Sequence, residues 1–91
     1  MIVTTSIFLI TVICEESESE HLVSNVRMLE PVHYSIEDVK YGIGTGSEKS
    51  GKKVQFLFKR NLYQKAMSYI IDNYVKRYGA VIYAIEADVL Y

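Results

Sequence analysis

Hydrophobic and polar positions follow two different periods along this chain. Residues 7–14 are apolar at successive positions and rich in β-branched side chains, which predicts a buried strand. Ser17 and Glu20 then have the spacing of a capping box, with Ser17 as the N-cap of a helix that ends before Pro31. Apolar residues recur within this segment at helical spacing: Leu22, Val23, Val26 and Leu29.

The middle of the chain has the period of strands. Residues 32–41 mix polar and apolar side chains on both faces, which indicates an edge strand. A loop rich in Gly, Ser and Lys follows over 42–52, and residues 53–59 alternate again. The sequence Val54-Gln55-Phe56-Leu57-Phe58 is typical of a strand with Phe56 and Phe58 on its core face.

A second helix is the clearest element. Asn61 suits its N-cap, and Gly79 suits the left-handed position just past its end. Residues 80–91 then predict the last strand. The apolar stripe of the helix comprises Leu62, Tyr63, Ala66, Met67, Ile70, Ile71, Tyr74 and Tyr78.

This β-α-β-β-α-β order predicts a single α+β domain over residues 1–91. Right-handed crossovers give a ferredoxin-like sandwich, with a four-stranded antiparallel sheet and two helices on one face. The strands over 7–14 and 80–91 are apolar on both faces, although helices cover only one face. We therefore expect a second copy of the chain to cover the open face.

Composition excludes several classes of function. The formal net charge is −1, so no global field favours nucleic acid or an acidic membrane. The apolar start lacks a preceding basic residue, which argues against a signal peptide, and it is too short to span a bilayer. The single cysteine, Cys14, suits a reducing compartment, and we expect a cytoplasmic protein.

The stretch GSEKSGKK, residues 46–53, is one residue away from a phosphate-binding P-loop. Lys53 stands where that motif needs a Ser or Thr hydroxyl for magnesium. A strand is predicted after it, whereas the motif requires a helix. We therefore expect a solvated hairpin loop without P-loop chemistry.

No residue pattern in the sequence indicates a catalytic site or a metal centre. His21 and His33 have no Cys or second His at ligand spacing. Cys14 has no basic neighbour in sequence that would activate its thiol. We predict neither an enzyme nor a metal protein.

Several blocks of the sequence resemble the PII-like signalling proteins, most closely the branch that accompanies bicarbonate transporters. The last block, residues 78–91, is the most specific: YGAVIYAIEADVLY. Residues 11–15, TVICE, resemble the first strand of that family and its acidic exit. Residues 34–44, YSIEDVKYGIG, resemble the second strand and the base of the T-loop.

This resemblance implies a homotrimer whose sheets cover one another. It also implies an adenine-nucleotide site between subunits, for AMP, ADP, ATP or cyclic AMP as an effector, with no cofactor required. The T-loop would span about 42–53. The implied nucleotide-binding residues are Ser35, Tyr41, Gly42, Gly44, Lys76, Arg77, Tyr78, Gly79 and Ala80.

The nucleotide state would set the T-loop, which would contact a membrane transporter or an enzyme. The expected partner-binding residues are Thr45, Lys49, Lys52 and Lys53, in a segment where Glu48 is the single acid. Ala80 stands at the family's lysine position, which favours weak discrimination between phosphates. Two alternatives are a structural or interaction trimer without a ligand and a small ferredoxin-like hydrolase; the hydrolase lacks an Arg between its first strand and helix.

Overall fold

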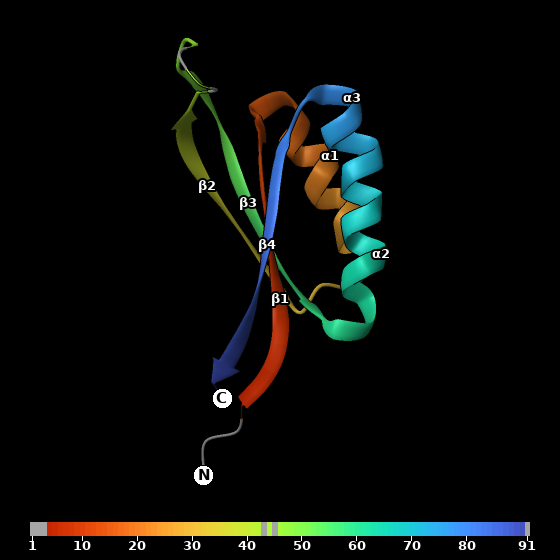
Figure 1. The fold of residues 1–91 in the computed structure, drawn as a ribbon. Helices are drawn as coiled ribbons and strands as arrows, with labels where there is room; N and C mark the ends of the chain where they lie inside the picture. The colour runs from red at the N-terminus through yellow and green to blue at the C-terminus, as the bar shows by residue number, and fades with distance from the viewer. Residues whose placement is uncertain (1–3, 43, 45, 91) are drawn as a thin grey trace.

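The order of elements matches the predicted ferredoxin-like α+β fold. A computed structural model describes residues 4–42, 44 and 46–90. Helical segments α2, η1 and α3 follow one another without a break and form one rod (Figure 1). The elements are β1 (Thr4–Glu15), α1 (Glu16–Arg27), β2 (His33–Tyr41), β3 (Lys49–Lys59), α2 (Arg60–Ile70), the π-helical turn η1 (Ile71–Val75), α3 (Lys76–Tyr78) and β4 (Val81–Leu90).

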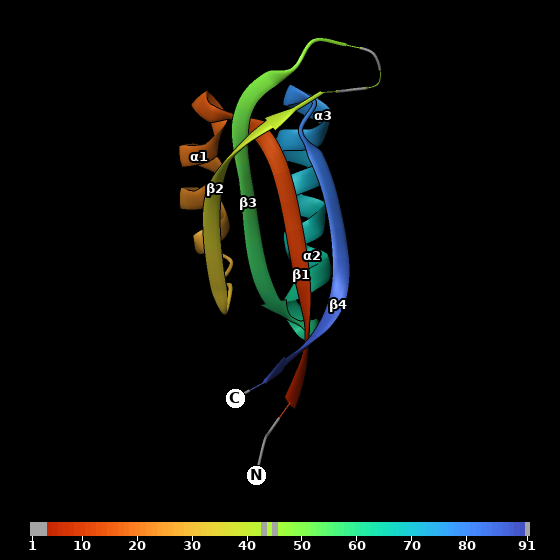
Figure 2. The same ribbon diagram turned by 90° about the vertical axis from the view of Figure 1, so that its left-hand side faces the viewer.

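The four strands form one antiparallel sheet in the order β2-β3-β1-β4. Helix α1 and the rod formed by α2, η1 and α3 lie side by side on the same face of this sheet (Figure 1). The opposite face, turned toward the viewer in Figure 2, carries no helix. The described part of the chain therefore has the one-sided covering that the sequence predicted.

Alternate residues of the two central strands build the core against the helices. Ile10 pairs with Phe56, and Val12 pairs with Val54. All four side chains are fully buried, because they point to the face that α1 and α2 cover. From the helices, the core receives Leu22, Val26, Ala66, Ile70 and Tyr74.

The open face of the sheet exposes apolar side chains along β4. Val81, Tyr83 and Ile85 are 39%, 47% and 54% exposed. Ile85 pairs with Leu9 of β1, which in turn pairs with Leu57 of β3. This row of apolar side chains confirms that the strands near both ends of the chain have an apolar face that the helices do not cover.

The structure corrects several predicted element boundaries, and strand β1 begins at Thr4 rather than at residue 7. Helix α1 has its N-cap at Glu15, not Ser17, and helix α2 has its N-cap at Lys59, not Asn61. Strand β3 begins at Lys49 rather than at residue 53. Pairing with β1 and β2 extends the strand, since Lys49 pairs with Tyr41 and Gly51 pairs with Glu15.

The first turn of α1 shows why the cap was misplaced. The Glu18 carboxylate accepts a hydrogen bond from the backbone of Glu15, the reciprocal half of a capping box. The acidic run offers more than one Glu that can reach back in this way. The register was therefore ambiguous in the sequence.

The end of the second helical rod confirms the role predicted for Gly79. Its φ is 74°, in the left-handed region where glycine lacks the penalty of a Cβ atom. Its backbone N–H donates to the Val75 carbonyl at 3.0 Å. Immediately before this end lies η1, whose hydrogen bonds span five residues where those of an α-helix span four.

The π-helical turn changes the predicted apolar stripe. Tyr74 remains in the core at 4% exposed, whereas Tyr78 is 54% exposed. An extra residue in the turn shifts the phase of everything after it around the helix axis. Tyr78 therefore leaves the buried stripe to which α-helical spacing assigned it.

Candidate functional site

The residues predicted to bind a nucleotide lie on two opposite edges of the sheet. Ser35 and Tyr41 belong to edge strand β2, and Gly79 and Ala80 precede edge strand β4. Strands β3 and β1 separate these edges, a distance of roughly 14 Å at the usual strand spacing. The two groups do not meet within one chain, although the end of β2 and the start of β4 lie toward the same end of the sheet (Figure 2). Ser35 lies near the start of β2, six residues before Tyr41.

Glycines with positive φ follow the end of β2 and precede the start of β4. Gly44 has a φ of 58° and Gly79 a φ of 74°. A Cβ atom at either position would meet nothing within 4 Å. The backbone is therefore open at both turns, and a ligand could approach it closely.

Pairing of β3 with β2 on one side and β1 on the other gives the predicted partner-binding lysines acidic neighbours. Lys53 Nζ lies 3.5 Å from Glu37 Oε1, and Lys49 Nζ lies 3.7 Å from Glu15 Oε1. Lys52 donates a hydrogen bond to Asp38, which raises the pKa of the Lys52 ammonium. The segment is therefore less basic in space than in sequence, and the fourth predicted residue, Thr45, lies outside the described residues.

The near P-loop is followed by a strand and not by a helix, as the sequence analysis expected, but its second half is not the solvated hairpin loop that was predicted: residues 49–53 belong to β3, and Gly51 is buried. Residues from Lys49 onward are paired in β3, with Lys52 opposite Asp38 and Cys14. No helix N-terminus follows the Gly51-Lys52-Lys53 sequence, because β3 continues to Lys59. The helix amides that hold phosphate in a P-loop are therefore not available to this stretch.

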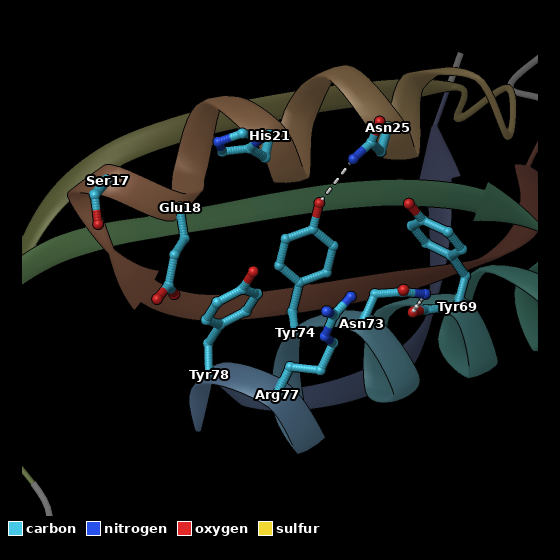
Figure 3. A pocket seen from close by; sticks show the side chains of 9 residues that line it. All are labelled: Ser17, Glu18, His21, Asn25, Tyr69, Asn73, Tyr74, Arg77 and Tyr78. Atoms are coloured by element: carbon cyan, nitrogen blue, oxygen red, sulfur yellow. Dashed lines mark hydrogen bonds between the residues drawn. The ribbon is translucent and has the colours of Figure 1, made fainter.

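A pocket that the sequence analysis did not predict lies between α1 and the second helical rod (Figure 3). We name it the interhelical pocket. Its volume is about 360 Å³, and its nine lining residues all carry a polar group. They are Ser17, Glu18, His21, Asn25, Tyr69, Asn73, Tyr74, Arg77 and Tyr78.

One hydrogen bond joins the two walls of the interhelical pocket. Asn25 Nδ2 of α1 donates to Tyr74 Oη of η1 at 3.0 Å (Figure 3). Burial raises the pKa of Tyr74, while the bond from Asn25 lowers it. Elsewhere in the pocket, Asn73 Nδ2 donates to the Tyr69 carbonyl at 2.9 Å, which fixes the Asn73 amide against its own helix.

Opposite charges face the interhelical pocket from its two walls. Glu18 extends from α1, and Arg77 extends from α3 (Figure 3). Burial raises the pKa of Glu18, with a further increase from the charge of Glu15. In the described chain, no ion pair within 4.0 Å joins Arg77 to any carboxylate.

Two of the predicted nucleotide-binding residues belong to this pocket. Arg77 and Tyr78 line it on the helical side of the molecule, whereas Lys76 makes an ion pair of 3.1 Å with Asp72 along the helix. The π-helical turn η1 rotates the residues that follow it around the helix axis, and this rotation places Arg77 and Tyr78 in the pocket. The recurrence of Tyr at 69, 74 and 78 was the available signal, but α-helical spacing placed Tyr74 and Tyr78 in the core stripe and left Tyr69 out of it.

The described residues contain neither a cluster of metal-ligating side chains nor a helix that could span a membrane. None of their His, Cys, Asp and Glu side chains form a group that could hold a metal ion. Within the same residues, no helix is long and apolar enough to cross a membrane.

Comparison with solved structures identifies the fold. A PII-like signalling protein of Thermus thermophilus matches with a TM-score of 0.80 and 20% identity, over 94% of this chain and 90% of that one. CPII of Thiomonas intermedia, a nitrogen regulatory PII-like protein solved with ADP, AMP and bicarbonate, matches with a TM-score of 0.82 and 11% identity, over 96% of both chains. The chain therefore has the fold of PII-like proteins.

The same fold is shared more widely. CutA of Synechococcus elongatus matches with a TM-score of 0.78 and 11% identity, over 98% of this chain and 85% of that one. No family model and no curated protein matches the sequence. At these identities the likeness concerns the fold, and function has to be argued from the site.

Proposed function

We propose that this protein is a homotrimeric PII-like regulator that binds an adenine nucleotide between subunits and acts on a protein partner. The observation that carries the proposal is the position of two open glycine turns toward one end of opposite sheet edges. A neighbouring copy packed on the open face would bring one chain's β2 edge beside another chain's β4 edge. The nucleotide bound to CPII supports the choice of ligand.

The exposed apolar face of β4 supports the trimer. Tyr83 and Ile85 are about half exposed in the single chain, and specific association buries roughly 800 Å² per partner. Packing of this face against another copy would remove these side chains from water, which is favourable in proportion to the apolar area.

The proposed nucleotide cleft comprises the edge residues that do not face the interhelical pocket. Lys40 makes no ion pair among the described residues, and the Lys76–Asp72 pair is exposed enough to exchange partners. Both ammonium groups could meet phosphates as point charges. The remaining proposed residues are Ser35, Tyr41, Gly42, Gly44, Gly79 and Ala80.

A thermal-shift experiment with AMP, ADP, ATP and cyclic AMP tests the ligand. Binding at a hundred times the Kd should stabilise the folded protein by about 2.7 kcal/mol, which raises the Tm by several degrees. Lys40→Gln and Lys76→Gln should reduce the shift, and Lys65→Gln, outside the cleft, should leave it unchanged. A trimer that shows no shift with any nucleotide would favour the alternative of a structural trimer without a ligand.

The partner would bind the connection between β2 and β3. Three projecting copies add avidity to weak contacts. Lys49 and Lys53 lie close to carboxylates, so positive charge contributes less to partner binding than the sequence suggested. Among the described residues, Lys40 is then the main cation without an ion-pair partner near this connection. A pull-down tests this surface by comparing the intact protein with one whose residues 44–48, between the ends of β2 and β3, are replaced by a two-residue turn; equal recovery of partners would contradict it.

A further inference from the structure

The interhelical pocket has the size of a small-molecule site, and its lining combines aromatic rings with polar groups. Its volume of about 360 Å³ lies within the range of ligand pockets. None of its nine lining residues is aliphatic, and three Tyr rings form much of one wall (Figure 3). The Tyr69 and Tyr74 ring centroids lie 6.4 Å apart, and those of Tyr74 and Tyr78 lie 6.2 Å apart.

The walls are anchored in the fold. Tyr74 is 4% exposed, and its hydroxyl is held by Asn25 across the pocket. Asn73 is held by the carbonyl of Tyr69. These bonds preorganise the Tyr74 ring and the amides of Asn25 and Asn73, so a ligand would not have to order these groups on binding.

The charges of the pocket select the ligand class. Glu18 and Arg77 enter from opposite walls (Figure 3), and neither has an ion-pair partner within 4.0 Å among the described residues. A polyanion such as a nucleoside triphosphate would be repelled by Glu18. A simple organic cation would be repelled by Arg77. A small molecule with one positive and one negative group satisfies both.

We propose that the interhelical pocket binds a free α-amino acid. Its carboxylate would accept hydrogen bonds from the Arg77 guanidinium, whose planar fork suits a carboxylate. Its ammonium would donate to the Glu18 carboxylate. Its side chain would lie against the Tyr rings, where flat or apolar groups gain contact area. This site is on the helical side of the molecule and is separate from the proposed nucleotide cleft.

The experiment uses the full-length protein and the twenty standard L-α-amino acids, each tested alone by thermal shift without nucleotide. The amino acid with the largest shift is then titrated by calorimetry, beside its decarboxylated amine and its deaminated acid. We expect both analogues to bind at least about tenfold more weakly, because each loses one charge-assisted contact. The outcome does not depend on whether the cleft binds a nucleotide.

Matched variants connect the binding to the pocket. Arg77→Gln and Glu18→Gln should each lower the affinity for the amino acid by about tenfold or more. Gln at position 18 retains an oxygen for the Glu15 backbone, so α1 keeps its cap. Lys65→Gln and Glu20→Gln, on the same helices but outside the pocket, should bind as the parent does.

Side-chain amide signals in NMR spectra give a second readout. Addition of the amino acid should shift the NH₂ resonances of Asn25 and Asn73, which line the pocket, and leave those of Asn61 in place. Absence of binding by all twenty amino acids would overturn the proposal. Equal binding by the amine or the acid, or binding that survives both Gln substitutions, would also overturn it.

Discussion

The ring of Tyr41 lies where a side chain at position 51 would be. A Cβ atom on Gly51 would come 2.5 Å from Tyr41 Cε1 and 2.4 Å from the Cys14 carbonyl oxygen. Glycine therefore allows the Tyr41 ring to pack on strand β3, next to the start of the connection over 42–48. One side of the proposed nucleotide cleft depends on this close approach.

Gly51→Ala should destabilise the protein. The methyl group would displace the Tyr41 ring and push against the backbone of β1, a cost of about 1–3 kcal/mol by analogy with overpacked cores. Gly42→Ala is the matched control, because its Cβ would meet nothing closer than 3.7 Å. Urea denaturation measures both; equal stability of the two variants would contradict the close approach.

Gly79→Ala should cost about 1–2 kcal/mol of unfolding free energy, since a Cβ atom is disfavoured at a φ of 74°. Space is not the cause, because no atom lies within 4 Å of that Cβ position. Gly79→Asn should therefore lose less, as Asn tolerates left-handed backbone better. Chemical denaturation of the three proteins checks this order, and a greater loss for Asn would refute the conformational explanation.

Ile85→Arg should prevent assembly without unfolding the subunit. Ile85 is 54% exposed in the single chain, so an arginine there costs the isolated fold little but places a charge in the proposed interface. Sedimentation equilibrium at micromolar concentration should give about three times the subunit mass for the parent and the subunit mass for the variant. Met28→Arg, 80% exposed on the helical side, should remain trimeric; a monomeric parent would refute the trimer.

Cys14 should react slowly while the protein is folded. Burial, assisted by the negative charges of Glu18 and Glu15, raises the pKa of its thiol from 9.0 to about 11. The reactive thiolate is then about a hundredfold rarer at pH 8, and the side chain is 1% exposed. Disulfide-exchange reagents should therefore label it at least about a hundredfold faster in denaturant; comparable rates would contradict its burial.

The same thiol makes stability depend on alkaline pH. Between pH 9 and about pH 11 the unfolded chain loses the thiol proton and the folded chain retains it, so stability falls as the pH rises. The contribution is fully present below pH 9. Cys14→Ala should show a shallower fall over this range when denaturation midpoints are compared, and an unchanged slope would contradict the shifted pKa.

Local patterns in the sequence were enough to predict the order of elements and the faces of the strands. Alternation at Val54, Phe56 and Phe58 predicted three side chains that are fully buried, because a strand's period of two follows from backbone geometry alone. Gly79 marked the helix end for a similarly local reason, since few residues adopt its positive φ. Apolar residues on both faces of the first and last strands indicated, from the sequence alone, that the helices leave one apolar face of the sheet uncovered.

Which side chains meet, by contrast, depends on tertiary packing. Lys53 appeared in sequence as part of a basic loop, but strand pairing sets it opposite Glu37. The π-helical turn moved Tyr78 out of the core and into the interhelical pocket, a change of phase that α-helical periodicity does not encode. The pocket itself joins Asn25 to Tyr74, 49 residues apart, and such a contact depends on how α1 and the second helical rod pack on one face of the sheet rather than on any local pattern.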